Sequence, residues 1–65
     1  MPLTVNGREA PMPDPPTLEG LLAVLHPRQP FAVARNEEVV QRSKYQQCNL
    51  VDGDRIEIVH PSAGG

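Results

Sequence analysis

Apolar and polar residues alternate at the start of the chain, and this pattern predicts a β-hairpin. Leu3 and Val5 are separated by a polar residue, as in a strand with one face against a core. The Asn6-Gly7 dipeptide follows, which is favoured in the type I′ turns that join antiparallel strands. The second strand is predicted over about residues 8–12. It should end at Pro13-Asp14-Pro15-Pro16, because proline cannot donate a backbone hydrogen bond to a neighbouring strand.

The next segment has leucines spaced as on one face of a helix. They stand at positions i, i+3, i+4 and i+7, as Leu18, Leu21, Leu22 and Leu25. We expect Thr17 to cap this helix and Glu19 to interact favourably with the helix dipole. The helix should end near His26, because the proline that follows disfavours the helical conformation in the residue before it. Gly20 costs about 1 kcal/mol relative to alanine inside a helix, and a close approach of the helix to a sheet would explain its presence.

Three more strands are predicted after the helix. Residues 31–35 form the first, with Phe31 and Val33 on one face, and Asn36-Glu37 turns the chain into a shorter strand at residues 38–40. The last strand is predicted over residues 55–60. Its Ile56 and Ile58 side chains should face the core, and the alternating residues Arg55, Glu57 and Val59 should face the opposite side.

The segment between these strands gives a weaker pattern. From Arg42 to Leu50 most residues are polar, so we expect a loop or a single helical turn that is anchored by Tyr45, Cys48 and Leu50. Asp52-Gly53-Asp54 is expected to form a turn.

The order of these elements predicts the fold class. Two strands, a helix, two strands and a last strand are typical of an α+β fold of the β-grasp (ubiquitin-like) type, a roll in which a mixed sheet of about five strands packs on one helix. We expect residues 1–60 to form a single domain and residues 61–65 a flexible tail. A chain of 65 residues leaves no room for a deep enzyme cleft, because a domain this small buries only about 60% of the surface of its unfolded chain.

Composition narrows the function classes. The net charge is −2 and the six Lys and Arg residues are scattered, so we expect no nucleic-acid partner. A single cysteine excludes an intramolecular disulfide and a CxxC zinc site, which fits a reducing compartment. No segment has the ~20 apolar residues of a membrane helix, and the N-terminus does not resemble a signal peptide. The expected location is therefore the cytoplasm, with no membrane contact.

The sequence ends in Gly64-Gly65, and this makes the C-terminal carboxylate the leading candidate for a reactive group. Glycine lacks a Cβ atom and can lie in a passage too narrow for other residues. The five residues from Pro61 to Gly65 could carry the carboxylate roughly 16 Å from the end of the last strand, at about 3.3 Å per residue. The alternative interpretation is that small residues at a chain end simply fray.

Other side chains have ordinary explanations. Cys48 is interpreted as a small packing residue and not as a sulfur-relay thiol. His26 and His60 are interpreted as residues at the ends of a helix and a strand, because neither has a nucleophile and a carboxylate arranged around it. Lys44 fits a solvated surface lysine, and the acids of the predicted turn at residues 52–54 fit turn formation better than paired acid chemistry.

The chain as a whole resembles the ThiS family of thiamin-biosynthesis sulfur carriers. The order and spacing of the shared features carry this resemblance, together with the terminal Gly-Gly. The matching positions are Asn6-Gly7, Thr17-Leu18, Leu21-Leu22, Ala32 to Asn36, Val39-Val40, Arg42, Tyr45, Leu50, Asp52 to Asp54, Ile56 to Val59 and Gly64-Gly65.

The resemblance implies a carrier and not an enzyme. The Gly65 carboxylate, at the end of the tail residues Ala63 and Gly64, would be adenylated by an E1-like (ThiF-type) enzyme and converted to a thiocarboxylate by a persulfide sulfur donor. The thiocarboxylate would then give its sulfur to thiazole synthase (ThiG type) for thiazole formation. ATP and magnesium would be used by the activating enzyme, so this chain needs no metal or other cofactor of its own.

Partner docking is predicted next to the tail. Val59, with Glu57 and Arg55 beside it, would form a modest patch that faces a partner protein. Several alternatives remain open from the sequence: a related sulfur carrier for molybdopterin, cysteine or tRNA thiolation, a ubiquitin-like protein modifier that forms an isopeptide through Gly65, and a binding module in which Gly-Gly is incidental.

Overall fold

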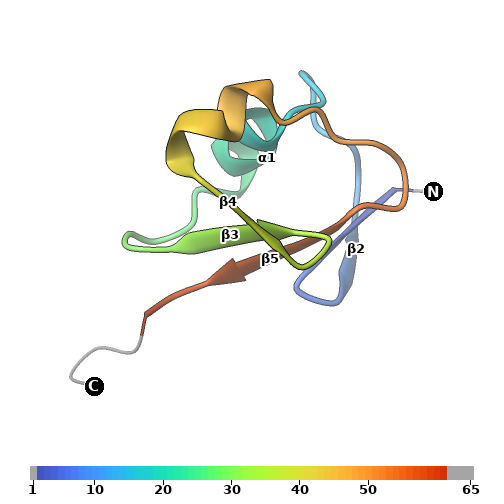
Figure 1. The fold of residues 1–65 in the computed structure, drawn as a ribbon. Helices are drawn as coiled ribbons and strands as arrows, with labels where there is room; N and C mark the ends of the chain where they lie inside the picture. Colours follow the sequence, from blue (N-terminus) through green and yellow to red (C-terminus); the bar gives the residue numbers. More distant parts are fainter. Residues whose placement is uncertain (1, 62–65) are drawn as a thin grey trace.

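The computed structural model describes residues 2–61, which form a β-sheet with helices on one of its faces (Figure 1). The elements in chain order are β1 (Leu3–Val5), β2 (Arg8–Ala10), α1 (Leu18–Leu25), β3 (Ala32–Arg35), β4 (Glu38–Val40), the 3-10 helix η1 (Arg42–Gln47) and β5 (Arg55–Val59). This is the predicted order of two strands, a helix, two strands and a last strand. The α+β class is therefore confirmed.

The last strand lies in the middle of the sheet. The five described strands are arranged as β2-β1-β5-β3-β4. β5 runs parallel to β1, with Val5 opposite Ile56, and antiparallel to β3, with Ala32 opposite Val59. The sheet is thus mixed, as predicted, because β5 joins two antiparallel hairpins that come earlier in the chain.

Both hairpins turn through residues with positive φ angles. Asn6 and Gly7 have φ of 50° and 81°, and Asn36 and Glu37 have φ of 51° and 73°. Positive φ at both central positions is the signature of a type I′ turn, whose twist suits an antiparallel hairpin. The turn predicted at Asn6-Gly7 is confirmed, and the second hairpin uses the same backbone conformation without a glycine.

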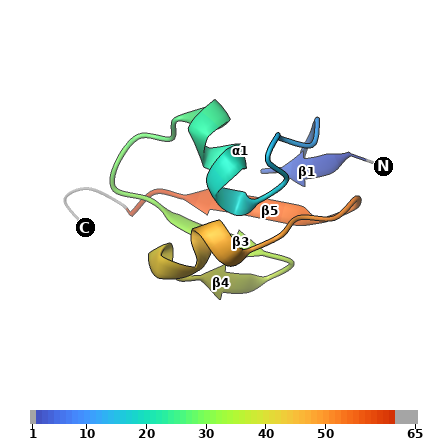
Figure 2. The ribbon, with the colours of Figure 1, turned by 90° about the horizontal axis from the view of Figure 1, so that it is seen from above.

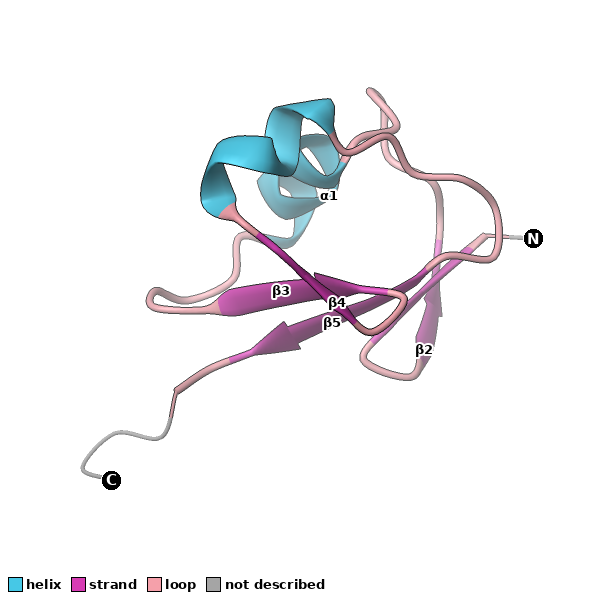
Figure 3. Cartoon of the chain, in the orientation of Figure 1, coloured by secondary structure: helices cyan, strands magenta, loops and turns pink. Residues whose placement is uncertain are grey.

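One face of the sheet carries the core. Helix α1 and η1 both cover this face, as Figures 2 and 3 show from two directions. The buried apolar side chains within the described residues come from the sheet, the helix and the segment after η1: Leu3, Leu18, Leu21, Leu22, Val33, Leu50 and Ile56. The other face of the sheet has no helix over it among residues 2–61.

Helix α1 has the predicted caps. Thr17 accepts a hydrogen bond from the Gly20 backbone N–H at 3.0 Å, which satisfies one donor of the first turn. At the other end His26 takes a left-handed conformation with φ of 50°, and its N–H donates to the Leu22 carbonyl. The helix therefore ends where the sequence predicts, one residue before Pro27.

The explanation predicted for Gly20 is wrong. Gly20 does not approach the sheet; it faces the proline-rich segment before the helix. A Cβ atom at this position would overlap the carbonyl oxygen of Pro15. The same carbonyl accepts a hydrogen bond of 2.8 Å from the Thr17 N–H, so the segment folds back over the start of α1.

Strand ends differ from the prediction by one or two residues. β2 ends at Ala10 and not near residue 12, because Pro11 has no N–H to pair, and Met12 packs against the core instead. β3 begins at Ala32, directly after Phe31, and β5 ends at Val59 and not at His60. Phe31 still contacts the core from outside the strand.

The weakly patterned segment after β4 forms η1. Its C-terminal side is joined to the start of α1 by backbone hydrogen bonds, from the Leu18 N–H to the Cys48 carbonyl at 2.9 Å and from the Leu50 N–H to the Pro16 carbonyl at 2.8 Å. Tyr45 and Cys48 are packed at the edge of the core. The three predicted anchors of this segment are therefore confirmed.

Candidate functional site

The candidate site is the C-terminal part of the chain, which β5 leads out of the sheet. β5 is hydrogen-bonded on both sides, and exposed His60 and Pro61 follow it (Figure 1). The predicted site residues Ala63, Gly64 and Gly65 lie outside the described residues, so the structure is informative about the base of the tail and not about its reactive end.

Two asparagines hold β5 from opposite sides. Asn6 accepts a hydrogen bond of 2.8 Å from the Ile58 N–H through Oδ1, and its Nδ2 donates to the Ile58 carbonyl at 3.3 Å. Asn36 accepts from the Arg55 N–H through Oδ1 at 2.9 Å, and its own N–H donates to the Arg55 carbonyl at 2.7 Å. Each asparagine is the first of the two central residues of a type I′ turn. The two turns therefore fix both ends of the strand that precedes the tail.

The start of β5 is also held by a buried carboxylate. Asp54 is 4% exposed. It accepts hydrogen bonds from Arg35 Nε at 2.9 Å, from Asn36 Nδ2 at 3.1 Å and from the Val51 N–H at 2.9 Å. The turn predicted at residues 52–54 is present, with Gly53 at φ of 89°, and Asp54 has this additional role in tertiary structure.

These contacts decide the protonation of Asp54. Burial by itself raises the pKa of Asp54, but the hydrogen bonds from Val51, Asn36 and Arg35 and the charge of Arg35 together lower the pKa below its ordinary value. The carboxylate thus stays charged and structural. No local spacing in the sequence indicates this contact, because Arg35 and Asp54 are 19 residues apart.

The docking residues predicted from the sequence lie on the uncovered face of the sheet. Arg55, Glu57 and Val59 are all exposed there, and Val59 is 57% exposed. Ala32 lies opposite Val59, and Ala34 lies between Glu57 and Val39, which is 76% exposed. We call this surface the open face and define it by its outward residues: Thr4, Ala32, Ala34, Val39, Arg55, Glu57 and Val59.

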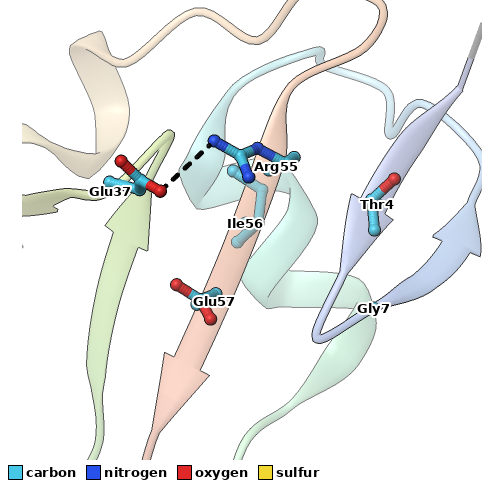
Figure 4. A pocket seen from close by; sticks show the side chains of 6 residues that line it. All are labelled: Thr4, Gly7, Glu37, Arg55, Ile56 and Glu57. Atoms are coloured by element: carbon cyan, nitrogen blue, oxygen red, sulfur yellow. Dashed lines mark ion pairs between the residues drawn. The ribbon is translucent and has the colours of Figure 1, made fainter.

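The open face is apolar at one end and charged at the other. Val59, Ala32, Ala34 and Val39 form an apolar stripe over β5, β3 and β4. Near the start of β5, Arg55 reaches toward Glu37, and the two form an exposed ion pair at 3.6 Å (Figure 4). Surface pairs of this kind contribute at most about 1 kcal/mol. A hollow of about 230 Å³ lies here, lined by Thr4, Gly7, Glu37, Arg55, Ile56 and Glu57.

Within residues 2–61 the structure gives no catalytic surroundings to the cysteine, the histidines and the lysine that were interpreted above as packing, element-end and surface residues. Cys48 is half-buried against the core, with its Sγ 3.9 Å from Arg35 Nη1. His26 caps α1, and His60 follows β5 at the surface. Lys44 is exposed on η1.

Residues 2–61 contain neither a metal-binding cluster nor a membrane-spanning helix. No group of three or more His, Cys, Asp or Glu side chains there could hold a metal ion. In the same residues no helix combines the length and the apolar character needed to cross a membrane.

Comparisons with known proteins agree over nearly the whole chain. A family model described as the ThiS family matches residues 3–65. The sulfur carrier protein ThiS of Bacillus subtilis is 34% identical over 65 residues, which cover 97% of this chain and 98% of that protein. Thiazole synthase of Paramagnetospirillum magneticum is 41% identical over 66 aligned residues. The alignment covers 100% of this chain but only 20% of that protein.

Solved structures give the same result. The crystal structure of a thiamine biosynthesis protein (ThiS) from Geobacter metallireducens matches with a TM-score of 0.81 and 31% identity, over 100% of both chains. A solution NMR structure of a thiamine biosynthesis protein from the same organism matches with a TM-score of 0.74 and 30% identity, over 100% of this chain and 88% of the other. The predicted β-grasp fold is thereby confirmed.

Proposed function

The chain belongs to the ThiS family, and we propose that the carboxylate of Gly65 is the group on which it carries sulfur for thiamin biosynthesis. Members of this family are sulfur carriers and not catalysts. The observation that carries the proposal is that the family match continues through the tail to Gly65. Ala63 and Gly64 would form the narrow end of the tail that enters a partner.

The chemistry of a carboxylate explains why activation comes first. A carboxylate is a poor electrophile, because its negative charge repels nucleophiles. If a carboxylate oxygen of Gly65 attacks the α-phosphate of ATP, pyrophosphate leaves and an acyl-adenylate forms. A persulfide sulfur can then attack the acyl carbon and expel AMP. Cleavage of the resulting S–S bond by a thiol leaves the thiocarboxylate on Gly65. ATP and magnesium belong to an E1-like (ThiF-type) enzyme in this scheme, and the carrier binds no cofactor.

The open face is the proposed docking surface for this activating enzyme. The apolar stripe around Val59 continues along the strand that leads into the tail, so a partner bound there is within reach of Gly65. Fully extended, the tail from Pro61 spans roughly 16 Å at about 3.3 Å per residue. Glu57 and Arg55 would form the polar margin of the contact, as is usual for protein interfaces.

Thiazole synthase (ThiG type) is the proposed acceptor of the sulfur. The similarity to a segment of a protein named thiazole synthase supports this assignment, because that protein contains a carrier-like segment and a much longer remainder. A thiocarboxylate is a nucleophilic form of sulfur on a tether, which suits delivery into an enzyme that builds a sulfur-containing ring.

Intact-mass spectrometry tests the proposal. The chain is incubated with a ThiF-type enzyme, magnesium-ATP and a sulfide or persulfide donor. The expected product has one oxygen replaced by sulfur, and fragmentation places the exchange at Gly65. A matched control carries extra residues after Gly65, which removes the free glycine carboxylate and should abolish the exchange. Unchanged mass with several enzymes that are active on other carriers would contradict the proposal and favour a binding module.

A further inference from the structure

A concave surface lies at the end of the molecule where the chain leaves the sheet. The residues that line it come from three segments that are far apart in the sequence: the loop between α1 and β3, the start of η1, and the two residues after β5. Figures 1 and 2 show these segments at the same end of the molecule. We call it the exit groove and define it by Arg28, Gln29, Pro30, Arg42, Tyr45 and His60.

The exit groove consists of two hollows that adjoin at the loop before β3. Gln29 and Pro30 line the hollow next to His60 and Pro61, and they also line the hollow next to Arg42 and Tyr45. The part beside His60 has a volume of about 520 Å³. Because Pro61 is the last described residue, the groove begins where the tail begins.

The charges of the groove are not neutralised by the chain. Arg28 and Arg42 are exposed, and neither has an ion-pair partner within residues 2–61. Of the other described arginines, Arg35 and Arg55 are paired with carboxylates, whereas the exposed Arg8 on β2 has no ion-pair partner within residues 2–61. Glu19 lines an adjoining hollow together with His26 and Arg42, and it forms no ion pair with Arg42.

Acidic residues gather at the opposite end of β5. Asp52 and Asp54 come directly before the strand, and Glu37 and Glu38 stand at the turn that contacts its first residue. Two of these acids, Asp54 and Glu37, are paired with Arg35 and Arg55, so the two ends of β5 differ mainly in the unpaired guanidinium groups of Arg28 and Arg42 at the end that carries the tail. A net charge of −2 gives no sign of this unpaired positive charge.

We propose that the exit groove binds an acidic segment of the enzyme that activates Gly65. The inference rests on the proposed function. An enzyme that receives Gly65 comes within roughly 16 Å of Pro61, since the tail cannot reach further at about 3.3 Å per residue. A partner surface therefore has to lie beside the groove. Arginine and tyrosine are enriched in protein interfaces, so the residues of the groove suit a contact with a partner. The unpaired guanidinium groups favour carboxylates on that partner, because arginine binds a carboxylate in a bidentate manner.

This contact differs in role from the apolar stripe of the open face. Charges at the margin of an interface mainly accelerate association and set its orientation, whereas buried apolar contacts slow dissociation. The exit groove would therefore orient the carrier so that its tail faces the entrance of the enzyme. A charge change in the groove should alter the concentration of carrier that the enzyme needs, and not the rate at saturation.

A pair of charge reversals tests the inference. R28E/R42E reverses the charge of the groove. R8E/K44E makes the same total change at two exposed positions that do not line it, on β2 and on η1. A ThiF-type enzyme is assayed for pyrophosphate release with each carrier, at about 50 and 200 mM salt, where charges are weakly and strongly screened respectively. Thermal unfolding followed by circular dichroism checks that each variant is folded.

The expected result is an increase of about tenfold in KM for R28E/R42E at low salt, with kcat unchanged. R8E/K44E should change KM by much less, and added salt should raise KM for the wild type more than for R28E/R42E. The neutral variant R28Q/R42Q should lie between them, and it replaces R28E/R42E if the charge reversal unfolds the protein.

Four outcomes overturn the inference. Equal effects of the two charge reversals would show a general attraction that does not involve the groove. A change in oligomeric state of R28E/R42E without a change in KM would assign the groove to a second copy of the chain. Failure of the wild type with enzymes active on other carriers would remove the proposed function together with this inference, whereas normal activity of R28E/R42E removes the inference alone.

Discussion

Hydrogen bonds from a few polar side chains fix the position of β5 in the sheet. Asn6 and Asn36 occupy equivalent turn positions and bond to the backbone of the same strand near its two ends. Asp54 connects the start of β5 to Arg35 of β3. Such contacts fix a strand more specifically than apolar packing does, because a hydrogen bond depends on direction as well as distance.

Replacement of Asn6 should loosen the end of β5 next to the tail. Asn6→Gly removes the side-chain bonds to Ile58 and keeps the positive φ angle, so the unfolding free energy should fall by about 1 kcal/mol, with contributions from the lost hydrogen bonds and from the greater freedom of glycine in the unfolded chain. Urea denaturation measures this loss. The control is Asn6→Asp, which keeps an oxygen acceptor for the Ile58 N–H and should lose less. Equal stability of the glycine variant and the wild type would show that these bonds contribute nothing.

Asp54 should make the stability of the protein fall in acid. Its pKa is lowered in the folded state from an ordinary value of 3.8. The stabilisation is therefore complete at pH values above 3.8 and is lost as pH falls through the lower folded-state value. Unfolding free energies of the wild type and Asp54→Asn are to be measured by urea denaturation from about pH 6 to pH 2.

The variant should be less stable at neutral pH by roughly 1–3 kcal/mol, because the Arg35 guanidinium loses its charged partner. The difference between variant and wild type should shrink as the pH falls. A difference that stays constant down to pH 2 would mean that the Asp54 carboxylate is not stabilised by its charge.

At the scale of the elements, local sequence signals determine most helix and strand types, whereas tertiary contacts determine where the elements end. The hairpin turn, the caps of α1 and the alternation of β5 depend on near neighbours, and all of them are predicted by the sequence. The ends of β2, β3 and β5 shift by one or two residues, because pairing at a strand end depends on the neighbouring strand and on prolines such as Pro11 and Pro30. The 3-10 helix could only be predicted as a turn or loop, since its position depends on backbone bonds to the start of α1.

The contact between Gly20 and the loop before α1 predicts how an alanine at this position changes stability. An alanine inside an exposed helix would add about 1 kcal/mol of stability relative to glycine. Gly20→Ala should instead destabilise the protein by about 1–3 kcal/mol, because its Cβ meets the Pro15 carbonyl and the loop has to move. Thermal and urea unfolding measure the change, and Val24→Ala at an exposed position of the same helix is the control. A more stable Gly20→Ala variant would show that the loop moves without cost.

The whole molecule is organised around its C-terminal strand. The helical layer covers one face of the sheet and leaves the apolar stripe of the open face uncovered. The exit groove, with the unpaired Arg28 and Arg42, lies at the end of β5 from which the tail leaves. A carrier in this arrangement can bind a partner through its folded part while the tail enters that partner.

Val59→Asp tests the open face. A charge in the apolar stripe should weaken binding to the activating enzyme by about tenfold or more, the loss expected when an apolar contact in an interface is replaced by an unpaired charge. The fold should stay intact, because Val59 is 57% exposed. Isothermal titration calorimetry measures the affinity, and Val24→Asp makes the same change on an exposed site of the helical layer. An affinity equal to that of the wild type would remove Val59 from the docking surface.

The sequence by itself determined the element types, the α+β class and the candidate carboxylate of Gly65. These depend on hydrophobic spacing, turn dipeptides and the nature of the last residues, all of which are local. Only the tertiary structure decided what surrounds Asp54, what faces Gly20, and how Arg28 comes to lie beside His60. Those contacts join residues far apart in the chain, and their partners are chosen by how the hairpins and helices pack. No local pattern contains that information, because it arises when β5 inserts between β1 and β3.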